Sequence, residues 1–160
     1  MIPATFKNHI LSHIGRGIIP YHLGRVNASV CAIIVVETYF RCILLRLLEI
    51  IIWIVTRNNS MTIGLAQVRA TTWNEIGDFK DKRLYFKICM LVNYRANYDF
   101  VLKSLELNNI DMLNPEDVVA FHNGEHYRKS YLGLYKFSVD TINEYLREGK
   151  ISLNGTCKYF

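Results

Sequence analysis

Residues 83–92 read RLYFKICMLV, and this stretch decides which fold the sequence predicts. Every second side chain is large and apolar, which is typical of a half-buried β-strand. The side chains that would share the buried face are Leu84, Phe86, Ile88, Met90 and Val92. The sequence therefore predicts a central strand at this position.

A second long strand is predicted over residues 127–137, YRKSYLGLYKF, which alternate in the same way. Helix caps and turn residues place the other elements around these two strands. The remaining predicted elements are a short strand over 62–72, a connection over 73–82, a helix from a cap at Asn97 to Leu107, a helix over 139–148 between Ser138 and Gly149, and a last strand starting at Ile151.

Residues 114–124 leave two interpretations open. Asn-Pro-Glu-Asp at 114–117 is typical of a helix start, with proline in the first position and acids in the first turn. Residues 118–121 followed by Asn123-Gly124 are instead typical of a strand that enters a type I′ hairpin. We favour the hairpin because a long alternating strand follows. The order is then βαββαβ, so the predicted fold class is α+β, a two-layer ferredoxin-like domain.

Charge and hydropathy divide the chain in two. Residues 1–60 carry six Lys or Arg against two acids, and residues 61–160 carry thirteen against twelve, a difference of +1. We expect an apolar leader or amphipathic segment over 1–57 and a ferredoxin-like α+β domain over 61–160 that folds alone. The near-neutral charge of that domain argues against a general polyanion binder.

Residues 29–55, SVCAIIVVETYFRCILLRLLEIIIWIV, are the most apolar run. Their length fits a membrane helix, but each of four charges costs about 2.5–3.5 kcal/mol near the bilayer centre. Glu37 with Arg41 and Arg46 with Glu49 are spaced to pair along one helix. We expect an amphipathic helix that contacts a membrane surface or a protein partner, with a strand near Ile50 as the alternative.

The four cysteines favour a reducing compartment such as the cytoplasm, because they are far apart and form no C-x-x-C pair. They are Cys31, Cys42, Cys89 and Cys157. The N-terminal segment has two further interpretations. Residues 1–36 contain no acid, so residues 1–27 could target the protein to an organelle, or the residues upstream of Met61 could be a leader.

One face of the predicted sheet would be aromatic and cationic, and such a face stacks nucleic-acid bases. The candidate ligand-binding residues on it are Tyr85, Lys87, Lys129, Tyr131 and Tyr135. Residues 129–134 resemble the characteristic strand of the RNA-recognition motif at Lys129, Tyr131 and Leu134, and the resemblance implies binding of single-stranded nucleic acid. The alternative is that this face packs on the N-terminal segment or on another subunit.

Residues 122–126 read HNGEH, the H-x-x-E-H pattern of inverted zinc peptidases. That chemistry needs both histidines on one continuous helix, and Asn-Gly inside the pattern argues against one, so no metal site is predicted. Glu125, His126 and Tyr127 are the candidate acid–base residues, with a solvated turn as the alternative. The sequence contains no Walker loop and no G-x-G-x-x-G, so no cofactor is predicted.

The residues leave three functions open. The first is a small binding domain for single-stranded nucleic acid. The second is a homo-oligomeric enzyme or sensor for a small molecule, with sites between subunits. Ferredoxin-like chains form trimers of this kind in PII-like sensors and in phage lyases that act on S-adenosylmethionine, an analogy of fold alone. The third is a structural accessory subunit docked through residues 29–55.

Overall fold

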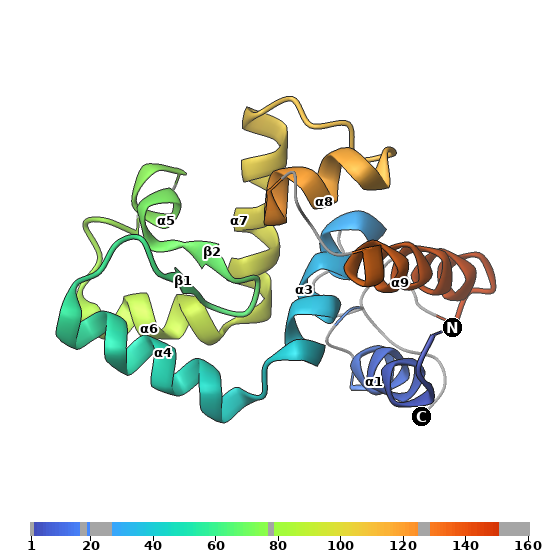
Figure 1. The fold of residues 1–160 in the computed structure, drawn as a ribbon, viewed down its shortest axis with the longest axis horizontal. Helices are drawn as coiled ribbons and strands as arrows, with labels where there is room; N and C mark the ends of the chain where they lie inside the picture. The colour runs from blue at the N-terminus through green and yellow to red at the C-terminus, as the bar shows by residue number, and fades with distance from the viewer. Residues whose placement is uncertain (1, 17–18, 20–26, 77–78, 125–128, 151–160) are drawn as a thin grey trace.

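The computed structural model describes residues 2–16, 19, 27–76, 79–124 and 129–150. The predicted ferredoxin-like fold is wrong, because the described residues form eight helices and one sheet of two short strands (Figure 1). In that sheet the strands are antiparallel, with Thr62 opposite Arg69. In chain order the elements are α1 (Ala4–Gly15), α3 (Ala28–Phe40), α4 (Ile43–Thr56), β1 (Thr62–Ile63), β2 (Val68–Arg69), α5 (Ala70–Ile76), α6 (Leu84–Val92), α7 (Tyr94–Leu107), α8 (Pro115–Asn123) and α9 (Lys129–Arg147).

The predicted central strand over residues 83–92 is helix α6. Leu91 is fully buried and Ile88, three residues earlier, packs beside the same core, which is helical spacing. Tyr85 and Phe86 are exposed. A run that is apolar at nearly every position satisfies the strand pattern and the helix pattern equally, so alternation could not separate them.

Residues 129–137 of the second predicted strand lie in helix α9, and residues 127–128 lie outside the described residues. Burial along α9 follows a period of 3.6 residues, not of two. The buried side chains are Tyr131, Leu134, Tyr135, Ser138 and Ile142. Ser138, the predicted cap, lies inside the helix and donates a hydrogen bond to the carbonyl of Leu134 at 2.8 Å. The predicted last strand from Ile151 lies outside the described residues.

Two helix starts follow capping rules. Asn114 accepts a hydrogen bond from the amide of Glu116, and Pro115 takes the first position of α8. The helix interpretation of this segment is therefore correct and the hairpin interpretation wrong. Asn93 caps α7 by accepting from the amide of Ala96, four positions before the predicted cap at Asn97.

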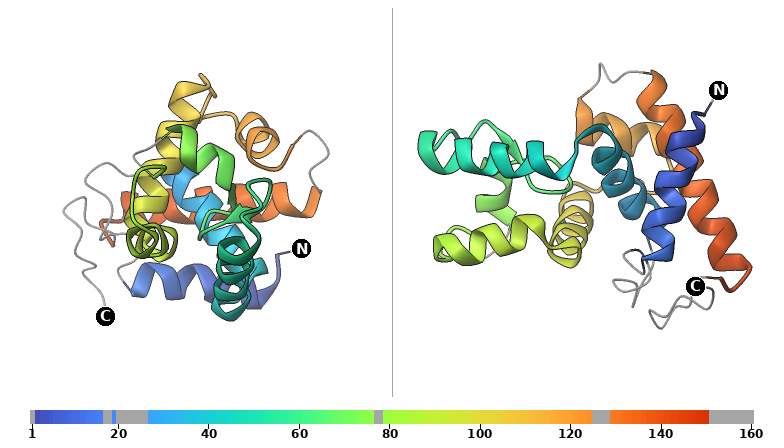
Figure 2. Two further views of the ribbon diagram at one scale, coloured as in Figure 1. Left: turned by 90° about the vertical axis from the view of Figure 1, so that its left-hand side faces the viewer. Right: turned by 90° about the horizontal axis from the view of Figure 1, so that it is seen from below.

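Helix α3 is the centre of the larger core. All its residues from Ala28 to Glu37 are buried, as expected of a helix that is apolar all round. Helices α1, α7 and α9 pack around it (Figures 1 and 2). The ring of Phe6 in α1 lies 6.4 Å from that of Phe137 in α9. The core therefore takes members from both sides of the expected boundary near residue 60.

A second, aromatic core lies between α4, the β1–β2 hairpin, α5, α6 and α7, on the left in Figure 1. Trp73 and Phe100 stack with ring centroids 3.9 Å apart, and Phe79 contacts both Trp73 and Trp53. Helix α7 contributes Phe100 here and Val101 to the larger core, so it joins the two cores.

Asn97 holds the hairpin against the junction of α6 and α7. Its side-chain amide donates to the carbonyls of Met90 and Leu91 at 3.0 and 3.1 Å, and its oxygen accepts from the amide of Ala66 at 3.2 Å. Gly64 has a positive φ of 82°, and a Cβ there would lie 3.0 Å from Asn97 Oδ1. This turn therefore needs glycine for both its conformation and its space.

The apolar run breaks at Arg41 and Cys42, where the extended backbone separates α3 from α4. Within the described part of the chain, no single helix has both the length and the hydropathy of a membrane span. Helices α3 and α4 meet those criteria only as a pair bent by 94°.

Candidate functional site

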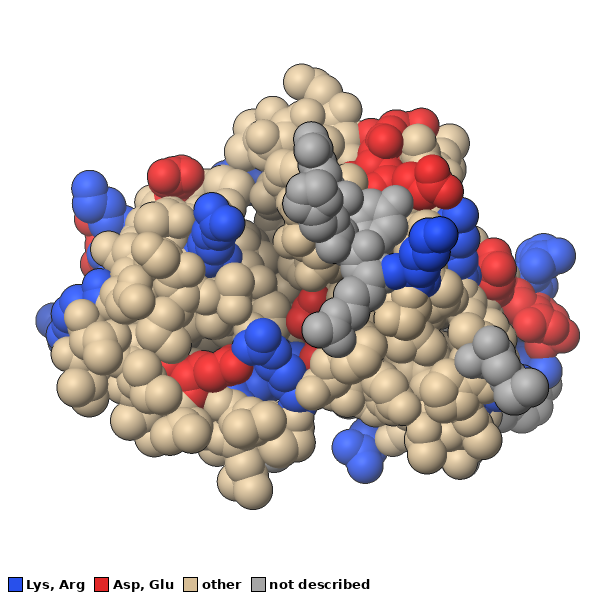
Figure 3. Space-filling model, viewed as in Figure 1, with Lys and Arg blue, Asp and Glu red and all other residues tan. Residues whose placement is uncertain are grey.

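A cleft of about 490 Å³ lies where α3, the hairpin, α7 and α8 meet. In Figure 3 the surface is hollowed between the two halves of the molecule, and acidic atoms are visible inside the hollow. Polar and apolar side chains both line the cleft, as in many small-molecule sites. The polar lining residues include Glu37, Arg41, Thr62, Gln67, Arg69, Thr72, Ser104, His122 and Asn123.

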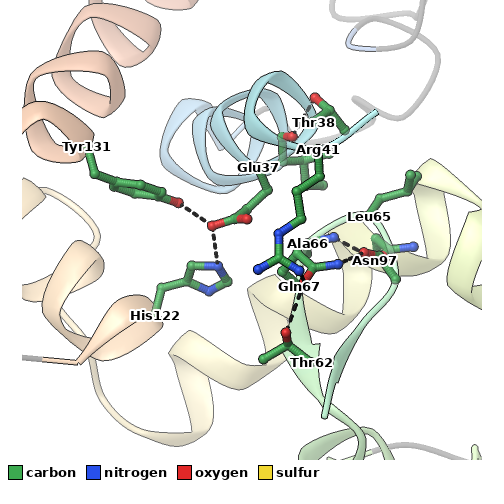
Figure 4. A network of polar contacts seen from close by, with 12 residues as sticks. Glu37, Thr38, Arg41, Thr62, Leu65, Ala66, Gln67, Asn97, His122 and Tyr131 are labelled. Atoms are coloured by element: carbon green, nitrogen blue, oxygen red, sulfur yellow. Dashed lines mark hydrogen bonds and ion pairs between the residues drawn. The ribbon is translucent and has the colours of Figure 1, made fainter. Parts of the chain in front are cut away.

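Glu37 is the buried carboxylate of this cleft. It sits in the last turns of α3, where the apolar run carries it into the protein, and its side chain is only 9% exposed. The Tyr131 hydroxyl donates a hydrogen bond to Glu37 Oε1 at 3.0 Å. Nε2 of His122 lies 3.5 Å from the same oxygen (Figure 4). Three helices, α3, α8 and α9, therefore place an acid, an imidazole and a phenol together.

His122 lies in the last turn of α8 and has a side chain that is 8% exposed. Its Nε2 faces the carboxylate, whereas its Nδ1 has no hydrogen-bond partner among the described residues. A carboxylate on one ring nitrogen fixes the tautomer and orientation of an imidazole, and leaves the other nitrogen to exchange a proton. The 3.5 Å separation is longer than an ordinary hydrogen bond, as is common before a ligand binds.

Burial raises the pKa of Tyr131 well above its ordinary value, and the negative charge of Glu37 raises it further. Tyr131 therefore stays a neutral hydrogen-bond donor at physiological pH. Its hydrogen bond limits the positions that the Glu37 carboxylate can adopt.

Arg46 is a buried cation at the end of α3, beside the backbone of Glu37. It is 2% exposed, and Nη2 donates to the Glu37 carbonyl at 2.5 Å, which satisfies one of the open carbonyls at the end of α3. Nη1 donates to the carbonyls of Gly64 and Leu65 at 2.5 and 2.8 Å. Burial lowers the pKa of Arg46, whereas the charges of Glu37 and Glu49 raise it.

Arg41 is held by a different acid from the one expected. Because the helix breaks after Phe40, its Nη1 contacts Glu49 Oε1 in α4, and also donates to Gln67 Oε1 at 2.6 Å. Gln67 Nε2 completes the triangle with Glu49 Oε2 at 2.8 Å. The expected pairs, Glu37 with Arg41 and Arg46 with Glu49, are therefore wrong, because they assumed one continuous helix.

Arg69 is an exposed cation of the cleft. It lies at the end of β2 and lines the cleft, and no ion pair or hydrogen bond is recorded for its side chain within the described residues. A guanidinium without a protein partner can accept a carboxylate or a phosphate in bidentate geometry. The cleft thus joins a potential anion contact to a buried acid and imidazole.

The predicted ligand-binding residues do not form one face. Tyr85 and Lys87 belong to α6, on the opposite side of the molecule from α9 (Figure 1). On α9, Lys129 is exposed, Tyr135 is fully buried and Tyr131 alone contacts the cleft network. The aromatic sheet face is absent from the described residues, so binding of single-stranded nucleic acid stays a prediction without that support.

The predicted acid–base residues, Glu125, His126 and Tyr127, lie outside the described residues. Sequence reasoning missed His122 and Glu37 in that role. Two patterns could have pointed to them: Glu37 is an acid inside the most apolar run, and His122 opens the HNGEH stretch. A buried acid needs a compensating partner, but its identity depends on long-range packing.

The described residues contain no group of three or more His, Cys, Asp or Glu side chains arranged to hold a metal ion. No protein-family model matches this chain, and neither a curated protein nor a solved structure matches it.

Proposed function

We propose that the cleft binds a small anionic molecule and that the pair of His122 and Glu37 transfers a proton to or from it. The observation that carries the proposal is the 3.5 Å contact between His122 Nε2 and Glu37 Oε1 in the wall of a 490 Å³ cleft. This retains the small-molecule alternative without the trimeric ferredoxin-like architecture or the S-adenosylmethionine analogy.

The roles follow from position. Arg69 contacts the anionic group of the ligand at the cleft surface. His122 accepts or donates the proton through Nδ1, while Glu37 stabilises the imidazolium that forms. Tyr131 holds the carboxylate of Glu37 in place, and Arg46 holds its backbone carbonyl. We place the protein in a reducing compartment, because Cys31, Cys42 and Cys89 form no disulfide with one another in the part of the chain that the structure describes.

Hydrolysis of p-nitrophenyl esters tests these roles without knowledge of the natural substrate. Water gives a proton to His122 and attacks the ester carbonyl, and p-nitrophenolate leaves with the bonding electron pair. We expect higher kcat/KM for the anionic mono-p-nitrophenyl glutarate than for neutral p-nitrophenyl acetate. The His122→Asn variant should lose about 10²–10⁴-fold in kcat, the usual range for general acid–base catalysis.

The control variants separate binding from proton transfer. Arg69→Gln should raise KM for the anionic ester and leave the acetate unchanged, whereas Arg147→Gln, an exposed arginine at the end of α9, should change neither. Melting temperatures of all variants exclude unfolding as the cause. Equal rates of wild type and His122→Asn on both esters would contradict the proton-transfer role.

A further inference from the structure

The outer face of α4 is covered by large aliphatic side chains. These are Leu44, Leu45, Leu47, Leu48, Ile51, Ile52 and Val55, which are between 40% and 76% exposed. In Figure 3 the lower left margin of the molecule, over α4, is mostly uncharged, and the acidic and basic atoms nearby lie above it, toward the hollow. A contiguous apolar patch of this extent marks an interaction site.

The charged residues of α4, Arg46 and Glu49, point the other way. Arg46 is buried under the hairpin, Glu49 is bound to Arg41 and Gln67, and Trp53 is buried in the aromatic core. The charged side chains of this amphipathic helix therefore face the protein interior, and its aliphatic side chains face the solvent. This arrangement uses the protein interior to satisfy the charges and leaves the outer face for a partner.

The most exposed side chains form a narrow stripe. Leu44 and Val55 are 73% and 76% exposed, and Leu48 and Ile51 are 51% and 56% exposed. Their spacing of four, three and four residues is that of the a and d positions of a coiled coil. The order of these separations is the same when the helix is followed from either end. An antiparallel copy of α4 would therefore place Leu48 against Ile51 and Leu44 against Val55.

We propose that α4 is a homodimer interface, in which two copies of this chain pair their α4 helices antiparallel about a two-fold axis. A two-fold interface brings the same surface of both chains together, which this symmetric stripe satisfies. The seven side chains provide most of the roughly 800 Å² that each partner of a standard-size interface buries. Homodimer interfaces are also the most apolar class of protein interface.

A lipid surface fits this face less well. Interfacial membrane helices carry aromatic anchors and Lys or Arg beside their apolar face. Within α4 the one tryptophan, Trp53, is buried and the one cation, Arg46, is 2% exposed, whereas exposed Phe40 and Arg57 lie only beyond the two ends of the helix. The second copy is therefore the occupant that the composition of the face favours.

The oligomeric state of the full chain tests the proposal. Light scattering after size exclusion should give a dimer for the wild type at micromolar concentration. Leu48→Lys and Ile51→Glu should each raise the dimer Kd by at least about 30-fold, the effect of losing a hot-spot residue. The control Leu113→Lys changes a leucine that is 91% exposed between α7 and α8, and should leave the dimer intact. Circular dichroism should show that all variants keep their helices.

Mixing the two monomeric variants tests the antiparallel register. A chain with Leu48→Lys and a chain with Ile51→Glu would bring the new lysine against the new glutamate across the axis, so the mixture should form heterodimers. A parallel pairing would not join them, and a mixture that stays monomeric would contradict the register. A monomeric wild type, a dimer insensitive to both substitutions, or a monomer that sediments with lipid vesicles through α4 would overturn the proposal.

Discussion

Arg46 Nη2 donates a hydrogen bond of 2.5 Å to the backbone carbonyl of Glu37, so one buried guanidinium closes the end of α3 beside the cleft carboxylate. The same side chain bonds the turn of the hairpin through Gly64 and Leu65. The acid of the cleft, the end of α3 and the hairpin are thus held by one residue.

Replacement of Arg46 by Met should lower the free energy of unfolding by about 3–5 kcal/mol, because it leaves several buried carbonyls without a donor and nearby acids without their cation. Urea unfolding followed by circular dichroism measures the change. Arg147→Met, at the exposed end of α9, is the matched control and should change stability by less than ~0.5 kcal/mol. A small effect at Arg46 would mean that water replaces its contacts.

Tyr131→Phe should destabilise the protein by about 1.5–3 kcal/mol, the usual contribution of a hydrogen bond to a charged group. The deleted hydroxyl donates to the buried Glu37 carboxylate at 3.0 Å. The same substitution at Tyr85, which is 71% exposed, serves as the control and should be close to neutral. Equal effects at both positions would show that the Tyr131 hydroxyl does not stabilise the carboxylate.

Stability should fall in acid because of His13. Burial lowers its pKa to about 3, with smaller contributions from His9 and Arg16, and its ring contacts Thr38 and Tyr94. Its unfolded pKa is about 6.5, so between these values only the unfolded chain binds the proton and stability rises with pH. The loss on acidification approaches 1.4 kcal/mol per pH unit, roughly, within that window.

Urea unfolding of wild type and His13→Gln between about pH 7 and pH 4 measures this dependence. The variant cannot titrate at this position, so its free energy of unfolding should depend less steeply on pH. The same slope in both proteins would show that His13 becomes protonated without unfolding the chain.

The division of the chain at residue 60 can be tested by truncation. Helix α3 supplies an unbroken buried segment from Ala28 to Glu37, against which α9 packs. We therefore expect residues 61–160 alone to lose cooperative thermal unfolding, measured by circular dichroism. A cooperative melt of the truncated chain would instead support an independent domain behind an N-terminal leader.

Capping signals could be read from the sequence only in part: the Asn114 start was one of two interpretations, and the caps predicted at Asn97 and Ser138 are wrong because both residues lie inside helices. The choice between helix and strand could not be predicted. The Asn-Pro-Glu-Asp start of α8 is recognisable because a cap depends on its own neighbours alone. The stretch Arg83–Val92 is different, because an apolar run is compatible with either structure until a core selects one face. In α9, Tyr131 and Tyr135 share a face under both patterns, and only the burial of Leu134 and Ser138 identifies the helix.

The sequence by itself determined that Glu37, Arg41, Arg46 and Glu49 would need compensation, because charges inside an apolar run cannot be buried alone. It could not determine the partners. The break after Phe40 redirects Arg41 to Glu49, and the packing of α9 on α3 brings Tyr131 to Glu37 from 94 positions away. Only the tertiary structure decides such pairs, because they depend on where each helix ends and on which helices cross. The spacing of side chains along the chain does not give the position of a helix end or of a helix crossing.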